Sequence, residues 1–328
     1  YDFGRGDIEA ALAAAPHKVE AKFAIGGQEH FYLEGQISMA SPGEGREMTV
    51  YASTQDPTEV QHIVARILGI PDAFVTVETR RMGGGFGGKE SQACAWAALA
   101  ALGAHVTGRP CKIRLDRDDD FALTGKRHAF RDDFRIGFDG EGRVSAYDVA
   151  LNANCGCSAD LSAGVVDRAM FHASNCYWLP VARVASRRLK TNIVSATAFR
   201  GFGGPQGMIG IERAMEAVAR ETGRDPLDVR FANLYRPGAD QTPYNMHVED
   251  TETLPAILRE LERTSDYRAR REAIKAFNAT SPILKKGIAL TPVQFGISFT
   301  LIHLNQAGAL VHVYSDGSIQ LNHGGTEM

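Results

Sequence analysis

The sequence has little cysteine and no surplus of basic residues. Five cysteines among 328 residues are too few and too scattered for a disulfide framework, and none joins histidines in a zinc-ligand spacing. An odd number of thiols in a long chain is typical of the reduced cytoplasm, and Cys155 and Cys157 are interpreted as ordinary packing residues. The formal net charge of −3 argues against nucleic acid as a partner.

Long apolar runs are also absent. No stretch reaches the length of a transmembrane helix, and the segment 1–5 does not resemble a signal peptide, so we expect no membrane partner. Both ends look cut, because the chain starts at Tyr1 rather than Met and stops within a glycine-containing stretch, 323–328. We therefore expect functional sequence beyond Met328.

Helical and strand patterns interleave without a regular βαβ rhythm, which predicts an α+β fold of mixed strands and helices. Helices are predicted at 7–14, 57–69, 91–104, 206–223, 254–263 and 266–278. Strands are predicted at 18–25, 47–54, 73–79, 111–116 and 286–293, with hairpins at 134–152 and 308–323. The polar segment 237–252 is predicted to be a linker between a first domain, 1–236, and the start of a second, 253–328.

Two glycine loops, each built around a phenylalanine, dominate the chain. The first is MGGGFGGKE (82–90) and the second is FRGFGGPQ (199–206). Glycine lets the backbone approach a ligand closely and adopt positive φ, so that successive N–H groups can point into one concavity. Two such loops predict two strips of backbone that grip a large, flat, oxygen-rich cofactor.

The first loop also matches two nucleotide-binding patterns. Gly83-x-Gly85-x-x-Gly88 follows a predicted strand and precedes a predicted helix, and the next strand ends at Asp116, so a nicotinamide-binding oxidoreductase remains an alternative. The same segment misses the phosphate-binding P-loop by one residue. Glu90 stands where that loop needs the hydroxyl of Ser or Thr to hold magnesium, which excludes an NTPase.

Six segments together resemble xanthine dehydrogenases, specifically the molybdenum-cofactor-binding portion of these molybdenum hydroxylases. They are 26–34, 51–55, 82–90, 167–172, 197–206 and 295–328. The resemblance implies two molybdopterin-binding domains, the second of them truncated, and a molybdenum centre with oxo and sulfido ligands. It implies that Fe–S clusters, FAD and NAD are bound by other domains or subunits, and that the assembly is an oligomer.

The resemblance also implies roles for individual residues. The cofactor would lie against Gln55, Gly85, Phe86, Gly87, Arg200 and Gly201, and of these Gln55, Phe86 and Arg200 would lie near the molybdenum. The substrate would lie against Glu90, Arg168, Phe202, Phe299 and Thr300. Considered without the resemblance, Glu90 is a helix-capping residue, Arg168 is a helical surface arginine, and the two phenylalanines are core residues.

The implied reaction is hydroxylation of a purine such as hypoxanthine or xanthine. Related aldehyde oxidases lack the pair of Glu90 and Arg168, so the pair favours a purine, although another heterocycle or an aldehyde remains an alternative. The family's general base is a glutamate in a Gly-Glu-Pro-Pro segment, and this sequence contains no such segment. We therefore assign no catalytic residue in this chain, and a non-catalytic scaffold is the non-enzymatic alternative.

Overall fold

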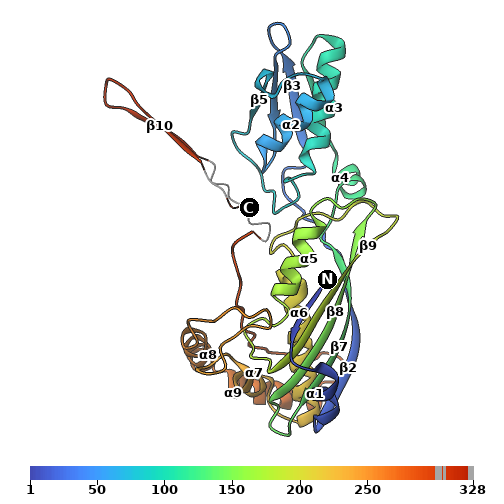
Figure 1. The fold of residues 1–328 in the computed structure, drawn as a ribbon, viewed down its shortest axis with the longest axis vertical. Coiled ribbons are helices and arrows are strands. Elements are labelled where there is room, and N and C mark those ends of the chain that lie inside the picture. The colour runs from blue at the N-terminus through green and yellow to red at the C-terminus, as the bar shows by residue number, and fades with distance from the viewer. Residues whose placement is uncertain (300–304, 306–307, 324–328) are drawn as a thin grey trace.

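The computed structural model describes residues 1–299, 305 and 308–323. The chain forms two units stacked along its long axis, with a helical arm and a hairpin that project from them (Figure 1). The α+β prediction is confirmed, because helices and mixed sheets both build the fold.

A five-stranded sheet forms the lower unit. Its strands, in spatial order, are β1 (Asp2–Arg5), β9 (Val181–Lys190), β8 (Val144–Gly156), β7 (Ala129–Phe138) and β2 (His17–Ile25). The neighbours pair antiparallel except β8 and β9, which are parallel. The predicted hairpin at 134–152 is confirmed, and Gly142 N–H donates to the Asp139 carbonyl at 3.0 Å in its turn.

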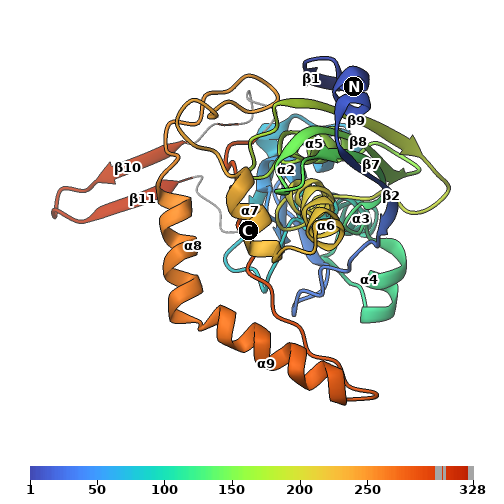
Figure 2. The same ribbon diagram turned by 90° about the horizontal axis from the view of Figure 1, so that it is seen from below.

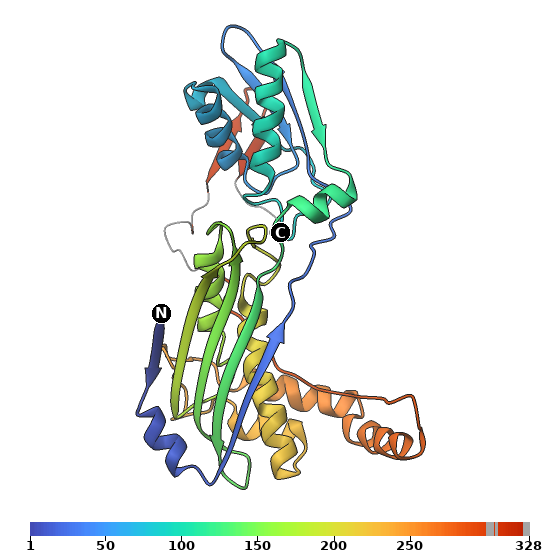
Figure 3. The ribbon, with the colours of Figure 1, turned by 90° about the vertical axis from the view of Figure 1, so that its right-hand side faces the viewer.

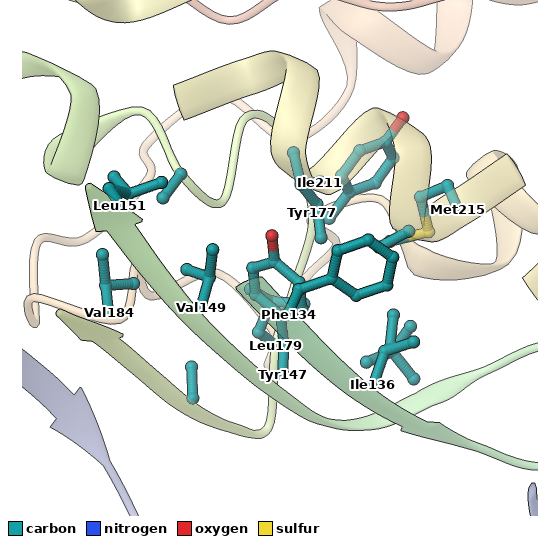
Figure 4. Packing of buried hydrophobic residues seen from close by; sticks show 14 of the residues in the cluster. Phe134, Ile136, Tyr147, Val149, Leu151, Tyr177, Leu179, Val184, Ile211 and Met215 are labelled. Atoms are coloured by element: carbon teal, nitrogen blue, oxygen red, sulfur yellow. The ribbon is translucent and has the colours of Figure 1, made fainter. Parts of the chain in front are cut away.

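Helices cover one face of this sheet. They are α5 (Ser162–Phe171) and α6 (Gly204–Thr222), with α7 (Pro226–Asn233) packed against α6, while the short α1 (Ile8–Ala14) packs near the end of the sheet (Figure 3). The core lies between the sheet and α6. There Phe134, Ile136 and Tyr147 from β7 and β8 meet Ile211 and Met215 from the helix (Figure 4).

The upper unit is an insertion between β2 and β7. Its sheet has the order β5 (Val75–Glu78), β4 (Met48–Ala52), β3 (Ile37–Pro42) and β6 (Cys111–Arg114). Two helices, α2 (Pro57–Leu68) and α3 (Ala93–Thr107), pack on this sheet, and the short η1 (Asp72–Phe74) and α4 (Arg117–Leu123) complete the unit. The predicted ends of α2 are confirmed, since Pro57 is its first residue and Gly69 caps it with φ 65°.

Much of the C-terminal part projects from the two units, although Leu258 of α8 is buried in the lower core and 292–299 is bonded by Arg168 and Asn175. Helices α8 (Thr253–Thr264) and α9 (Tyr267–Thr280) extend away from the sheet, as Figure 2 shows, and the hairpin of β10 (Ala309–Val313) and β11 (Ile319–His323) is exposed along its length. The segment 237–252 contains no helix or named strand, but its Tyr244 packs edge-on against Phe171 at 4.9 Å.

The strand prediction at 286–293 is wrong. The structure assigns no helix or strand between the end of α9 and Phe299, because side chains of other elements bond this backbone in place of a neighbouring strand. Asn175, for instance, donates to the Pro292 carbonyl at 2.9 Å. In the part of the chain that the structure describes, no helix is long and apolar enough to cross a membrane.

Candidate cofactor and substrate site

The two glycine loops belong to different units and meet where the units join. The backbone N–H of Arg200 donates to the Phe86 carbonyl at 2.9 Å, which links the centres of the loops. His30 lies within hydrogen-bond distance of the Ala198 carbonyl, at 2.7 Å from Nε2. A Cβ at Gly87 would stand 2.7 Å from the backbone carbon of Ala198, so only glycine permits this approach.

Both central phenylalanines adopt the left-handed backbone region that side chains disfavour. Phe86 has φ 54° and Phe202 has φ 48°. Such conformations cost on the order of 1–3 kcal/mol each and concentrate at functional sites, where the surrounding structure enforces them. The two loops thus share an unusual backbone conformation at their central residue.

Part of each loop is hydrogen-bonded within the protein. In the first loop the N–H groups that have protein acceptors are those of Gly83, Gly87, Gly88 and Lys89, and in the second they are those of Arg200, Phe202 and Gly204. The N–H groups of Gly85, Phe86 and Gly201 are not among these donors. Gly87 differs from our expectation, because its N–H holds the side chain of Gln55.

Gln55 is fixed in one orientation. Its Oε1 accepts hydrogen bonds from the N–H groups of Gly87 at 2.9 Å and Lys89 at 3.2 Å. The oxygen is identified by these two donors, so the other branch of the amide is the NH₂ group. That Nε2 is buried and has no partner in the described structure, although a buried amide ordinarily has one. The site therefore presents an unpaired donor beside the first loop.

Lys89 does not face the site. Its side chain is fully buried, and its ammonium group donates to Ser53 Oγ at 2.8 Å and to the Glu34 carbonyl at 2.7 Å. The Glu34 carboxylate also accepts a hydrogen bond from Gly83 N–H at 2.8 Å, so Lys89 and Glu34 together stabilise the start of the loop. Burial lowers the pKa of Lys89, and the charge of Glu34 opposes that shift. A lysine used in this way cannot hold a phosphate, which agrees with the exclusion of a P-loop.

Glu90 is the last residue of the first loop but does not cap a helix. The helix α3 begins at Ala93, and the residues between them are held by Asp160, which accepts from Ser91 at 2.7 Å and from Gln92 at 2.6 Å. Burial, and then the charges of Asp56 and Asp160, raise the pKa of Glu90 to about 7. The expectation of a helix-terminal carboxylate was wrong, and near neutral pH this carboxyl group can both donate and accept a hydrogen bond.

Arg168 lies on α5, but it is not a surface residue. It is 5% exposed, and its two Nη groups donate to the carbonyls of Gly296, at 2.7 Å, and Ser298. Its Nε is buried without a partner in the described structure, and burial lowers the pKa of the group. The guanidinium carbon lies 5.7 Å from the ring centroid of Phe202 and 5.3 Å from that of Phe295. The periodicity of α5 alone could not reveal this burial, because the covering segment comes from more than 120 residues further along the chain.

The structure brings Phe202 and Phe299 together. Their ring centroids are 4.9 Å apart and the rings are tilted by 52°. Both contact a small apolar cluster around Val165 and Ala198. A flat ring in van der Waals contact with two faces needs about 7 Å between them, so a heterocycle would have to move Phe299 away from Phe202. Thr300 lies outside the described residues.

The dinucleotide alternative fails on topology. The strands before and after α3, β5 and β6, lie at opposite edges of the four-stranded sheet with β4 and β3 between them. A dinucleotide fingerprint requires these two strands to be adjacent and parallel. Asp116, the expected ribose-binding acid, instead caps α4 by accepting from Asp119 N–H at 2.8 Å.

The loops and the donor at Gln55 suit an extended cofactor rich in acceptor atoms. The chain belongs to the molybdopterin cofactor-binding domain family, since residues 1–234 match one such family and 260–328 match a second. The cofactor is therefore molybdenum–molybdopterin. The groups present fit it, because the unpaired Nε2 of Gln55 suits an oxo ligand and the loop N–H groups suit pterin or phosphate acceptors.

Curated relatives of the chain include xanthine dehydrogenases. The chain is 46% identical to the xanthine dehydrogenase/oxidase of Rattus norvegicus over 99% of its length, and 44% identical to the xanthine dehydrogenase of Dictyostelium discoideum over 98%. It spans about a quarter, 24%, of the length of each. Among solved structures, the aldehyde oxidoreductase of Desulfovibrio gigas shares the fold, with a TM-score of 0.79 and 24% identity over 98% of this chain and 35% of that one.

Proposed function

We propose that this chain forms the substrate pocket and part of the cofactor cradle of an enzyme that hydroxylates a purine such as hypoxanthine or xanthine. The observation that carries the proposal is the combination of a carboxyl group with a pKa of about 7 at Glu90 and a buried guanidinium at Arg168. The loop of Asp160 connects them, because it bonds the residues after Glu90 and leads directly into α5. The relatives named xanthine dehydrogenase support the same substrate class.

Each residue has a distinct physical role in this proposal. When bound, the molybdenum centre supplies the two-electron acceptor for the oxidation. Gln55 would donate Nε2–H towards it, and the N–H groups of Gly85 and Gly201 would hold the pterin. Phe86 and Arg200 would place their backbones near the metal, and the bond between them keeps the two loops at a fixed separation.

The substrate would lie between Phe202 and Phe299, whose rings stack on it and exclude water. Glu90, whose pKa burial raises to about 7, would exchange a hydrogen bond with a ring nitrogen. Arg168 would stabilise negative charge that develops on a ring oxygen at the opposite end of the heterocycle. Thr300 is proposed as a polar neighbour of the substrate, as the resemblance implies.

The proposal extends to the partners. The general base, the Fe–S and flavin modules and the route of electrons to NAD are proposed to lie in other parts of the enzyme, which is proposed to be a cytoplasmic oligomer. The five free cysteines fit a reducing compartment.

The test is a comparison of substrate classes in the enzyme that contains this chain. Xanthine and an aromatic aldehyde of similar size are assayed with wild-type protein and with Glu90→Ala. We expect xanthine to be the better substrate and the variant to lose xanthine turnover by about 10²–10³-fold, because one oriented hydrogen bond in a water-poor site contributes that much. Aldehyde turnover should change far less. An enzyme that prefers the aldehyde, or that loses both activities equally, would contradict the purine proposal.

A further inference from the structure

The segment Pro292–Phe299, which we call the strap, is bound by side chains that lie on or just after α5. Asn175 donates to the Pro292 carbonyl at 2.9 Å and accepts from Gln294 N–H at 3.0 Å. Arg168 donates to two further carbonyls of the strap. The strap ends at Phe299, whose N–H and carbonyl both bond the side chain of Asn305. Its position therefore decides where the ring of Phe299 lies.

His172 makes the central contact with the strap. It is 8% exposed and stands at the C-terminal end of α5. Its Nδ1 lies 2.8 Å from the Arg168 carbonyl, which can only accept, and its Nε2 lies 2.9 Å from Gly296 N–H, which can only donate. The partners thus require a neutral imidazole with its proton on Nδ1, because a protonated ring has no acceptor for Gly296.

The contact of His172 lies between the two aromatic residues of the strap. The ring of Phe295 is 4.7 Å from the ring of His172 and rests on Gly204, where an added Cβ would stand 2.3 Å from the Phe295 ring. Three residues after Gly296, the ring of Phe299 meets Phe202. An anchor at Gly296 consequently fixes both rings against the site.

We propose that His172 is a positioning residue of the substrate slot, whose neutral imidazole anchors the strap at Gly296 and whose protonation releases the strap and withdraws Phe299 from Phe202. This inference rests on the proposed function only in taking the molecule bound in the slot to be a purine. It assigns His172 no contact with the substrate.

The surroundings of His172 set the direction of its response to pH. Arg168 is the charged group whose field acts on His172. The strap residues 292–299 carry no ionisable side chain, and Glu212 on α6 bonds Asn175 rather than His172. Burial, and to a smaller extent the charge of Arg168, lower the pKa of His172 from 6.5, against the hydrogen bond to the Arg168 carbonyl. The anchor is therefore complete above pH 6.5 and is lost as the pH falls through the lowered pKa.

Hydrogen exchange of the Gly296 amide tests the anchor without any substrate. The enzyme that contains this chain is compared with His172→Gln, which keeps an acceptor near Nε2 and cannot be protonated, and with His172→Phe, which removes the acceptor. His105→Gln, on the exposed end of α3, is the matched control. After correction for the intrinsic exchange rate, we expect wild type and the control to lose protection of 293–299 on acidification, whereas His172→Gln should stay protected. At pH 7.5, His172→Phe should exchange about fivefold faster than wild type, the ratio that corresponds to one neutral hydrogen bond.

Kinetics provide the second measurement. In wild type and the control, the KM for xanthine should rise by about fivefold below the pKa of His172, while His172→Gln should show no such rise and keep its kcat. Loss of strap protection on acidification that survives in His172→Gln would overturn the proposal, and so would wild-type exchange of the strap in His172→Phe. The exchange measurement uses no substrate, so its result would stand even if the enzyme did not act on purines. Failure of the His172 proposal and failure of the proposed substrate class can therefore be distinguished.

Discussion

Replacing Gly85 with alanine should damage the site through one identifiable contact. An added Cβ would stand 2.6 Å from Gln55 Oε1, whereas ordinary contacts begin at 3.4 Å, and Gly85 does not have the positive φ that would add backbone strain. The side chain of Gln55 must therefore move by nearly 1 Å. Its two hydrogen bonds, from Gly87 and Lys89, would lengthen beyond useful range.

The magnitude follows from those two bonds. Each buried N–H that loses its acceptor costs about 1–2 kcal/mol, so Gly85→Ala should lower the free energy of unfolding by about 2–4 kcal/mol. Gln55→Ala abandons the same two donors and should cost a similar amount. Gln55→Ala removes the three atoms nearest to the added methyl group, so in that background the second substitution should cost less than about 0.5 kcal/mol.

The assay is a double-mutant cycle on the enzyme that contains this chain. Urea midpoints of the four proteins give the coupling energy, and the molybdenum content of each gives the effect on the cofactor, which we expect to fall in every variant. Gly140→Ala is the control, because its Cβ would meet no atom within 4 Å and its φ is not positive. Additive costs for Gly85→Ala and Gln55→Ala would refute the contact on which this reasoning depends.

Three further substitutions probe the neighbouring groups. Because the pKa of Glu90 is raised to about 7, the folded state loses stability as the pH rises through 7. Glu90→Gln should therefore raise the urea midpoint at pH 8 and leave it unchanged at pH 4. The opposite order would contradict the burial of this carboxyl group. Arg168→Met should cut kcat and kcat/KM for xanthine by about 10²–10³-fold with normal molybdenum content, and unchanged kinetics would remove Arg168 from the substrate site. Lys89→Met should lower the free energy of unfolding by about 2–4 kcal/mol, since it removes a fully buried donor from Ser53 and Glu34; a midpoint equal to wild type would show that these bonds contribute nothing.

The sequence predicted most local structure where the pattern and the end signals agreed, as in α2 and in the hairpin of β7 and β8. It missed β9, whose sequence VARVASRRLK has no strict alternation, because the parallel pairing with β8 makes that segment a strand. It also placed a strand at 286–293, where alternating apolar residues instead follow the surface of other elements.

The candidate site was predictable in outline and not in detail. The two glycine loops are visible in the sequence, but the orientation of Gln55 depends on the N–H groups of Gly87 and Lys89, which only the folded loop brings together. His172 carries no pattern that distinguishes it from any buried histidine. Its partner, Gly296, is 124 residues away, and contacts of that kind follow from tertiary structure alone.

Because the upper unit is inserted between β2 and β7, the proposed cofactor cradle forms only when the two units come together. The two strands that flank the insertion pair directly, with Ile25 opposite Phe130, and the connections that leave them bond each other where Arg127 N–H donates to the Gln28 carbonyl at 3.0 Å. Each unit has its own apolar core, so each can become ordered before the two meet. Until they dock, the loop of Phe86 and the loop of Arg200 are on separate bodies, and the hydrogen bond that joins them cannot form. We therefore expect a chain whose units have not come together to bind the cofactor poorly, because the proposed site uses both loops.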